Sequence, residues 1–418
     1  MIIRSLYLNN FRCYKNFSIV FNERLTVLVG VNGSGKTTVL DAIKICFSMT
    51  DINNPIENLE IKIPLDDVSL DSKPEDITYQ VGIQDKYHFD GETDIIPFKI
   101  QNINDLYISL TYFNNHDNYF NIINKNKPLC VAYMSNRFIN NDEFILRNNK
   151  PSYSYSMLSD NNNTINYAST LEWFNNVDAD EARSIRDNGQ KNEHPELRAV
   201  REALSKALLG QFERPRMKGN PPELIIYKKG SDQSYKISQL SDGYRSMLAM
   251  VMDLARRMAQ IHSITGEPYK PILHTPAIVL IDEIELHLHP SWQQTVLTTL
   301  MEIFPNTQFI VTTHSPQVLT SIKPQHIRIL SDGKAYTVNE QTEGAESSRL
   351  MKHIFNVDQR PQNIEIVKAL RDYSELVIND QYDTEEAVLL RKRLDEHFGN
   401  DDLELIDLDL RIENNKWE

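Results

Sequence analysis

Apolar residues recur along this chain with two different spacings, and together these spacings predict an α/β fold. Compact apolar runs of strand length occupy residues 2–8, 25–29 and 277–281. In residues 35–47 the apolar positions return every third or fourth residue, as on one face of a helix. Strands that alternate with helices of this length predict a sheet covered by helices. The other predicted elements are helical residues 169–210, a strand within 223–229, a helix from about residue 244, a helix at 292–304, a strand at 308–313, and a hairpin at 327–338 that turns at Asp332 and Gly333.

Residues 50–165 interrupt this alternation. They are crowded with Asn and Asp and contain only short apolar segments, a composition typical of strands joined by loops. This predicts a lobe inserted into the α/β core. The predicted division is an N-terminal half of the core at 1–49, an insertion at 50–210, a C-terminal half of the core at 211–345 and a helical subdomain at 346–418.

The C-terminal end of the chain carries most of the negative charge. From Pro361 onward, 16 Asp or Glu stand against 7 Lys or Arg, while the whole chain has a net charge of -14. Apolar residues at helical spacing predict amphipathic helices there, with Gly399 as a helix cap. Such a subdomain is either a docking platform for a basic partner or a solvated cap on the core. The predicted stripes are Ile366, Val367, Leu370, Tyr373 and Val377, then Ala387, Leu390, Leu394 and Phe398, then Leu403, Ile406 and Leu410.

Composition limits the class of protein. With 418 residues, 40% of them hydrophobic, the chain can bury a sizeable core. No apolar run is long enough to span a membrane and the first residues lack a secretory signal, so we expect a cytoplasmic protein without membrane contacts. The acidic balance argues against a uniformly basic nucleic-acid binder. Cys13, Cys46 and Cys130 are scattered, which indicates neither a disulfide framework nor a zinc site.

Residues 30–37, with the sequence GVNGSGKT, match the phosphate-binding pattern G-x-x-x-x-G-K-[ST] between a strand and a helix. Glycines let backbone N–H groups face phosphates, and the helix N-terminus adds partial positive charge. We expect Lys36 to reach the β- and γ-phosphates of ATP and the Thr37 hydroxyl to bind Mg²⁺. The residues predicted to hold the nucleotide here are Asn32, Gly33, Ser34, Gly35, Lys36, Thr37 and Thr38.

Residues 280–290, with the sequence LIDEIELHLHP, end an apolar strand on two adjacent carboxylates. A phosphate loop needs such a strand end to complete its magnesium site. We therefore predict that Asp282 contacts Mg²⁺ and that Glu283 activates the attacking water. His287 and His289 follow two residues apart, but the sequence offers no evident third ligand for a metal ion beside them.

Residues 240–246, LSDGYRS, lead into a predicted helix and resemble the LSGGQ signature of ABC-type ATPases, with departures at Asp242 and Tyr244. The resemblance implies that Ser241 and Gly243 meet the γ-phosphate of a nucleotide bound to a second copy. A homodimer or higher homo-oligomer that sandwiches ATP is therefore expected.

Residues 312–316, TTHSP, follow a strand and place His314 where ABC-type ATPases have their switch histidine. Four motifs then occur in the order of that family: phosphate loop, signature, acidic strand end and switch histidine. The resemblance implies an ATPase in which Lys36, Glu283 and His314 act in catalysis.

The N-terminal residues 3–43 resemble RecF- and SMC-like ATPases, and DEIELHLHP resembles their relatives in prokaryotic anti-phage defence. In these relatives the segment NFR lies near the nucleotide, so Arg12 either stacks on adenine or is an ordinary surface arginine. The whole chain, including LEWF at 171–174, resembles the PtuA ATPases of Septu and retron-associated systems. That resemblance implies a separately encoded HNH nuclease partner, PtuB, and contact with nucleic acid through the complex.

Two alternative functions stay open. A RecF-like repair ATPase would bind DNA directly and would need a basic DNA-facing surface, which the acidic balance does not favour. An OLD-like ATPase would carry its own nuclease domain, but the residues after His314 show no such site, so no nuclease activity of the chain itself is expected. The glutamine that ABC-type ATPases use after the phosphate loop is not assigned among Gln80, Gln84 and Gln101, and Arg137 is a further loop candidate.

Overall fold

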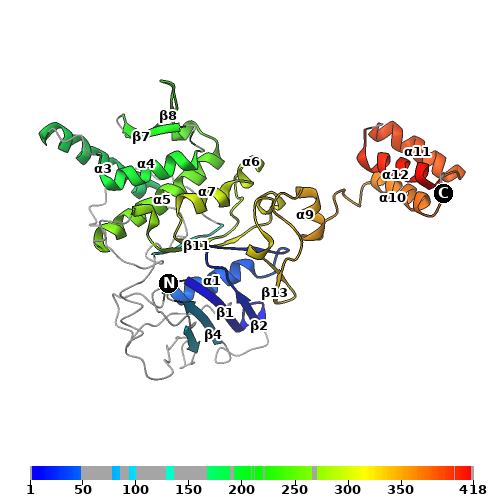
Figure 1. Ribbon diagram of the computed structural model, residues 1–418, viewed down its shortest axis with the longest axis horizontal. Helices are drawn as coiled ribbons and strands as arrows, with labels where there is room; N and C mark the ends of the chain where they lie inside the picture. Colours follow the sequence, from blue (N-terminus) through cyan, green and yellow to red (C-terminus); the bar gives the residue numbers. More distant parts are fainter. Residues whose placement is uncertain are drawn as a thin grey trace. The chain divides into compact units, whose positions relative to one another are not determined.

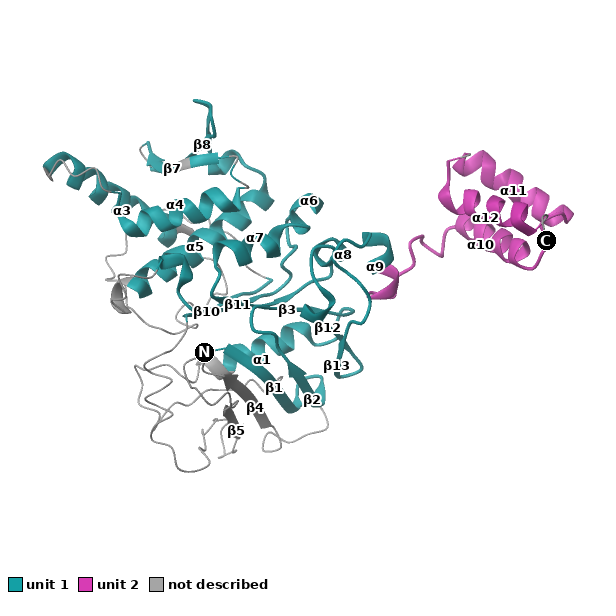
Figure 2. Cartoon of the chain, in the orientation of Figure 1, with its two compact units in different colours: residues 1–350 teal, residues 351–418 magenta. Residues whose placement is uncertain are grey.

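The computed structural model shows two compact units, residues 1–350 and residues 351–418 (Figures 1 and 2). The described residues are 2–48, 78–84, 94–99, 129–135, 167–188, 193–208, 210, 212–219, 222–265, 271–399 and 401–415.

A six-stranded sheet of order β13-β12-β3-β11-β10-β6 forms the centre of the first unit (Figure 1). β13 runs antiparallel to β12, and the other pairs are parallel. β3, β10 and β11 are buried along their whole length, as strands covered on both faces are. The carboxyl ends of such strands share one edge, where ligands bind in open α/β sheets. The strands are β3 (Leu25–Val29), β6 (Leu129–Tyr133), β10 (Ala277–Ile281), β11 (Thr307–Thr312), β12 (Ile327–Ser331) and β13 (Lys334–Thr337).

A second, antiparallel sheet has the order β2-β1-β4-β5. It shares one hydrophobic core with α1 (Lys36–Ser48) and the central sheet: Phe11 of the antiparallel sheet, Leu40 of α1 and Leu280 of the central sheet belong to the same buried cluster. The phosphate loop, which joins β3 to α1, is therefore anchored by packing on both sides. The strands are β1 (Ile2–Phe11), β2 (Tyr14–Val20), β4 (Thr78–Gln84) and β5 (Asp94–Lys99).

The structure differs from the predicted insertion at 50–210. β4 and β5 extend the antiparallel sheet, and β6 is the edge strand of the central sheet beside β10. The five residues of β6, LCVAY, form an apolar run as short as those of β3 and β10, but no neighbouring motif marks it as a strand of the central sheet. Residues 100–128 and 136–166 lie outside the described part of the chain.

Helices and a small sheet complete the first unit. α5 (Asp242–Thr265) starts within the signature segment, and α4 lies against it (Figure 1). The helix predicted at 292–304 is divided into two helices, because residues 294 and 295 form a turn. The other elements are α3 (Tyr167–Asn188), α4 (Pro195–Ala207), α6 (Pro290–Gln293), α7 (Val296–Ile303), α8 (Pro316–Leu319), β7 (Phe212–Lys218), β8 (Glu223–Lys228) and β9 (Ser234–Lys236).

The second unit is a helical bundle with its own core. α9 (Ser347–His353) spans the division between the units, followed by α10 (Glu365–Ile378), α11 (Glu385–Phe398) and α12 (Leu403–Asn415). Gly399 has φ of 70° and its N–H bonds to the carbonyl of Asp395 at 3.0 Å, so the predicted helix cap is confirmed. Eight of the nine predicted side chains of α10 and α11 belong to the core, and the ninth, Val367, is buried outside this cluster.

α12 does not bury the stripe that the sequence suggested. Leu405 and Leu408 face the core, whereas Leu403, Ile406 and Leu410 are 78%, 38% and 53% exposed. Both sets have helical spacing, so periodicity alone cannot choose the buried face. The fold class is nevertheless confirmed: an α/β core followed by a C-terminal helical unit. Across the described ranges, no helix is both long and apolar enough to cross a bilayer.

Candidate functional site

The phosphate loop leaves β3 and enters α1 at Lys36, and its shape depends on two glycines. Gly33 and Gly35 have φ of 80° and 92°, which a side chain would strain. An added Cβ at Gly35 would overlap the hydroxyl group of Tyr14, whereas Gly33 has no atom of another residue near that position. The loop is thus packed from behind by Tyr14 and open at Gly33.

Two polar groups of the loop fit an anionic ligand. The Lys36 ammonium donates to the carbonyl oxygens of Gly30 at 3.0 Å and Val31 at 2.9 Å. Burial lowers the pKa of this ammonium, and nearby carboxylates, Asp282 first among them, partly oppose the shift. The hydroxyl of Ser34 is buried and has no hydrogen-bond partner among the described residues. A buried donor without an acceptor, beside a buried cation, suits a phosphate group.

Asp282 follows the end of β10 and is 2% exposed. The Thr37 hydroxyl at the start of α1 donates to its Oδ2 at 3.1 Å, and the Thr312 hydroxyl at the end of β11 donates to its Oδ1 at 2.6 Å. The backbone N–H of Asp282 donates to the carbonyl of Tyr133 at 2.8 Å. The structure therefore brings together the hydroxyl and the carboxylate that were predicted to share Mg²⁺.

Glu283 has φ of 50°, in the left-handed region that costs a side-chain-bearing residue energy. Its N–H donates to the Thr312 hydroxyl at 2.8 Å, and the next N–H, of Ile284, donates to the Thr312 carbonyl at 3.1 Å. These two bonds hold the chain in its sharp turn after β10. Sequence reasoning missed Thr312, although it is the first residue of the TTHSP segment.

His314 is joined to the acidic segment by a residue that the motif analysis also missed. Glu285 accepts hydrogen bonds from the Thr313 hydroxyl at 2.7 Å and the His314 N–H at 2.6 Å. Burial first, and the Lys36 ammonium second, lower the pKa of His314 below 6.5. The imidazole is thus biased toward its neutral form near pH 7. The signal for Glu285 was its place two residues after Glu283 in DEIE.

The signature segment lies at the start of α5. Ser241 and Asp242 are exposed, but Gly243 is buried, and an added Cβ there would overlap the carbonyl oxygen of His287. The Tyr244 ring packs edge-on against Trp292, with ring centroids 4.4 Å apart. Of the hydrogen bonds formed by the described residues, none joins Ser241 to the phosphate loop of its own chain.

Arg12 has φ of 47° and its guanidinium pairs with Asp41 of α1 at 2.6 Å, close to its own neighbour Phe11. The pair fixes Arg12 on the helix that follows the phosphate loop. Asn32 is exposed at the tip of that loop, and Thr38 is buried in α1.

His289 caps α6, because its Nδ1 accepts the N–H of Ser291 at 3.3 Å. His287 is exposed with φ of 66°. No group of three potential metal-ligating side chains occurs in the part of the chain that the structure describes. Gln80 and Gln84 lie on β4, while Gln101 and Arg137 fall outside the described residues.

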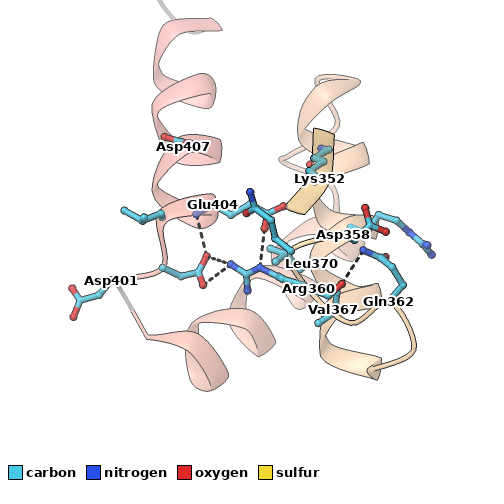
Figure 3. A pocket seen from close by; sticks show the side chains of 14 residues that line it. Lys352, Asp358, Arg360, Gln362, Val367, Leu370, Asp401, Glu404 and Asp407 are labelled. Atoms are coloured by element: carbon cyan, nitrogen blue, oxygen red, sulfur yellow. Dashed lines mark hydrogen bonds and ion pairs between the residues drawn. The ribbon is translucent and has the colours of Figure 1, made fainter. Parts of the chain in front are cut away.

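The second unit contains a cavity of about 680 Å³ (Figure 3). Arg360 crosses it and pairs with Asp402 at 2.7 Å and Glu404 at 3.1 Å, with its guanidinium over the Phe398 ring. Leu403, at one end of the exposed α12 stripe, also lines the cavity. The other acidic residues that line it are Asp358, Asp401 and Asp407.

Comparison with known proteins gives two overlapping family matches. Residues 1–205 match the family described as "AAA ATPase domain", and residues 131–320 match "AAA domain, putative AbiEii toxin, Type IV TA system". Among solved structures, the SMC head domain from Thermotoga maritima is 18% identical with a TM-score of 0.45, covering 82% of this chain and 100% of that one.

Three curated relatives have similar sequences. The Retron Ec83 probable ATPase of Escherichia coli is 40% identical over 222 residues, which cover 53% of this chain and 40% of that protein. The Retron Vc95 probable ATPase of Vibrio cholerae serotype O1 biovar El Tor is 24% identical over 95% of this chain and 87% of that protein. The Septu protein PtuA of Bacillus thuringiensis is 22% identical over 76% of this chain and 73% of that protein. The match therefore spans less than half of the Ec83 relative.

The central parallel sheet, the phosphate loop and the carboxylate pair after β10 have the arrangement of a P-loop ATPase, and residues 1–205 match an ATPase family. Its sequence is similar to those of the retron probable ATPases and of Septu PtuA.

Proposed function

We propose that the chain is the ATP-binding and ATP-hydrolysing subunit of an anti-phage defence complex, in which association of ATPase heads controls a separately encoded HNH-type nuclease. The observation that carries the ATPase part is the Asp282 carboxylate, held between the hydroxyls of Thr37 and Thr312 with Glu283 beside it. Similarity to retron and Septu ATPases supports the role in defence.

The residues of the site divide the chemistry among them. The backbone and side chains of residues 32–38 bind the phosphates of ATP. When ATP binds, the Lys36 ammonium donates to phosphate oxygens instead of the loop carbonyls. Thr37 and Asp282 would hold Mg²⁺, which supplies positive charge to neutralise the β- and γ-phosphates. Glu283, in its fixed backbone conformation, orients the attacking water and accepts its proton.

Pairing of two ATPase heads would bring the signature segment of one chain to the nucleotide bound by the other. Ser241 and Asp242 are exposed at the N-terminus of α5, where N–H groups and the helix dipole favour an anion. In the proposed homodimer or higher homo-oligomer, this N-terminus closes on the nucleotide of a second copy, and Gly243 packs against the carbonyl of His287 of its own chain. Neutral His314 then lies beside the γ-phosphate and Arg12 beside the adenine.

The second unit is proposed to dock the nuclease. The α12 stripe, Leu403, Ile406 and Leu410, is an exposed apolar row within a strongly acidic helix, and Asp407 lies in the same row. A basic amphipathic helix of a partner would fill the row with its apolar face and pair with the surrounding carboxylates. Nucleic acid would then be contacted through the complex rather than by this acidic chain alone.

The substitution Glu283→Gln tests the ATPase part. It keeps the size of the side chain but removes its ability to accept the water proton, so hydrolysis should fall at least about 100-fold while ATP still binds. An ATP-bound dimer should then accumulate, measured by light scattering on a sizing column with and without ATP and Mg²⁺.

Lys36→Ala is the matched control, because it removes nucleotide binding and should yield neither turnover nor ATP-dependent association. If Glu283→Gln stays monomeric with saturating ATP while the apo protein is also monomeric, the paired-head mechanism is wrong. The nuclease part is tested by co-purification with the HNH protein encoded by the neighbouring gene. If the chain does not co-purify with this protein but binds DNA by itself, the result would favour a RecF-like repair ATPase instead.

A further inference from the structure

A buried carboxylate on α5, the helix that carries the signature segment, is linked to Asp282 after β10 by two consecutive hydrogen bonds. Asp253, on α5, accepts a hydrogen bond at 3.0 Å from the hydroxyl of Tyr133, the last residue of β6. The carbonyl oxygen of the same tyrosine accepts the N–H of Asp282 at 2.8 Å. One residue therefore connects α5 to the backbone of the carboxylate at the proposed magnesium site.

The link has little freedom to move. Asp253 is 1% exposed, and the side chain of Tyr133 is buried beside it. Arg256 donates to Asp253 Oδ1 at 2.7 Å, Arg257 donates to Oδ2 at 2.8 Å, and Thr170 of α3 donates to Oδ1 at 3.3 Å. Burial alone would raise the pKa of Asp253, but the two arginines outweigh it and lower the pKa to about 2. The carboxylate is therefore ionised at neutral pH and accepts from all four donors.

Stability alone is a weak reason for this arrangement. Removing ionic groups from water is costly, and apolar side chains of similar volume often stabilise a core as well or better. A satisfied buried network does fix the relative geometry of the elements that it joins. Here those elements are α5, which carries the signature segment, α3, and β6, which pairs with the strand that ends at Asp282.

α5 is held by the acidic segment at a second point. Gly243, at the start of α5, lies against the carbonyl of His287, and Tyr244 packs against Trp292. Asp253 lies 10 residues after Gly243, so the two contacts are separated by about 15 Å of helix. A helix fixed at both points moves together with the strand end, and a displacement of the signature segment is transmitted to Asp282.

We propose that Tyr133 and Asp253 are positioning residues that couple the signature segment of a chain to its own Asp282 and Glu283, so that contact with a second copy sets the rate of hydrolysis. This inference rests on the proposed function, since it requires a paired ATPase. Neither residue touches the nucleotide site with its side chain, so both act through the backbone of Asp282 and through α5.

Tyr133→Phe tests the coupling, because it removes one hydroxyl and keeps the buried ring. ATP affinity, measured with a fluorescent ATP analogue, should stay within twofold of wild type because the phosphate loop is untouched. The kcat for ATP should fall about tenfold at saturating ATP, since a hydrogen bond to a buried charge is lost. The increase in specific activity with protein concentration, which reports paired heads, should become shallower.

Thr170→Val is the matched control. It removes the other neutral hydroxyl donor to the same carboxylate, also buried and also with little change of shape, but on α3 rather than on the strand beside β10. A purely structural network predicts equal effects of the two substitutions on thermal stability and on turnover. The coupling predicts a similar loss of thermal stability but a fall of kcat in Tyr133→Phe alone.

Two results would overturn the coupling: a kcat of Tyr133→Phe within twofold of wild type, or an equal fall of kcat in Thr170→Val. Either result leaves the proposed ATPase function intact, because wild-type turnover is measured in the same experiment. A wild-type chain that binds ATP but shows no turnover and no concentration dependence would instead remove the paired ATPase, and the coupling with it.

Discussion

At the scale of single residues, Thr312 connects the two carboxylates on which the proposed chemistry depends. Its hydroxyl donates to Asp282 at 2.6 Å and accepts the N–H of Glu283 at 2.8 Å. A hydroxyl has one hydrogen and two lone pairs, so both bonds form at once. The branched Cβ of threonine also restricts the rotamer. One side chain therefore orients the carboxylate of Asp282 and the backbone of Glu283.

Thr312→Val should lower kcat for ATP by about 10- to 100-fold while leaving ATP affinity nearly unchanged. The expectation follows because hydrogen bonds to a charged group and to a strained backbone are lost together. Thr307→Val is the control: it lies at the other end of β11, is equally buried, and its hydroxyl has no hydrogen-bond partner among the described residues. Steady-state kinetics of both variants decide the matter, and a similar kcat in the two would exclude this role of Thr312.

The predicted and the missed residues of the site differ in a physical way. Lys36, Thr37 and the Asp282–Glu283 pair stand at fixed spacings within continuous motifs, so the sequence alone pointed to them. Thr312 and Glu285 act across strands, and their partners are set by the parallel register that places Ile281 opposite Val311. No local pattern encodes that register.

At the scale of elements, the start of α5 is shaped by its contact with the segment after β10. Gly243 has no side chain, and the carbonyl of His287 occupies the place where a Cβ would lie. Alanine usually stabilises a helix relative to glycine by about 1 kcal/mol. At position 243, the overlap of an alanine Cβ with the carbonyl of His287 should instead make alanine less stable than glycine.

Gly243→Ala should therefore lower the melting temperature and weaken ATP-dependent association, because the signature segment is displaced. Ser246→Ala is the control on the same helix, since it makes a buried residue smaller and creates no overlap. Thermal unfolding and sedimentation with ATP are the measurements. A more stable Gly243→Ala protein with wild-type association would contradict the contact.

Elements next to a recognisable motif or with a helical repeat were predicted well, and strands without such a motif were not. The central strands β3, β10 and β11 and the helix α1 appear where apolar runs and helical spacing placed them. β6 is as short as β3 and β10, but it was missed because neither the phosphate loop nor the carboxylate pair follows it, and it lies in the Asn- and Asp-rich part of the sequence. α12 has two apolar faces with helical spacing. The face with Leu405 and Leu408 is the one that packs in the core with α10 and α11.

At the scale of the whole molecule, charge is divided between the two units. Residues 351–418 contain 17 Asp or Glu and 9 Lys or Arg, so this small unit carries more than half of the net charge of -14. Its own core is complete without its exposed leucines. The apolar row on α12 is therefore available for a partner without loss of the fold.

Leu410→Lys should weaken binding of the HNH nuclease by at least about tenfold while leaving ATP turnover of the isolated chain unchanged. It removes an apolar contact and places a positive charge against a basic partner. Ile378→Lys is the matched control, because Ile378 is 49% exposed, near the 53% of Leu410, but lies on α10. Calorimetric titration with purified nuclease compares them, and equal affinities would remove α12 from the docking surface.

The Lys36 ammonium already donates hydrogen bonds within the loop before a ligand binds. Its hydrogen bonds to the carbonyls of Gly30 and Val31 mean that nucleotide capture is an exchange of acceptors. An incoming group must offer more negative charge than two neutral carbonyl dipoles before the exchange is favourable. A triphosphate or diphosphate meets that requirement far better than a monophosphate or a nucleoside. We therefore expect the loop to bind ATP or ADP in preference to AMP or adenosine, because the charge of the phosphates decides the exchange.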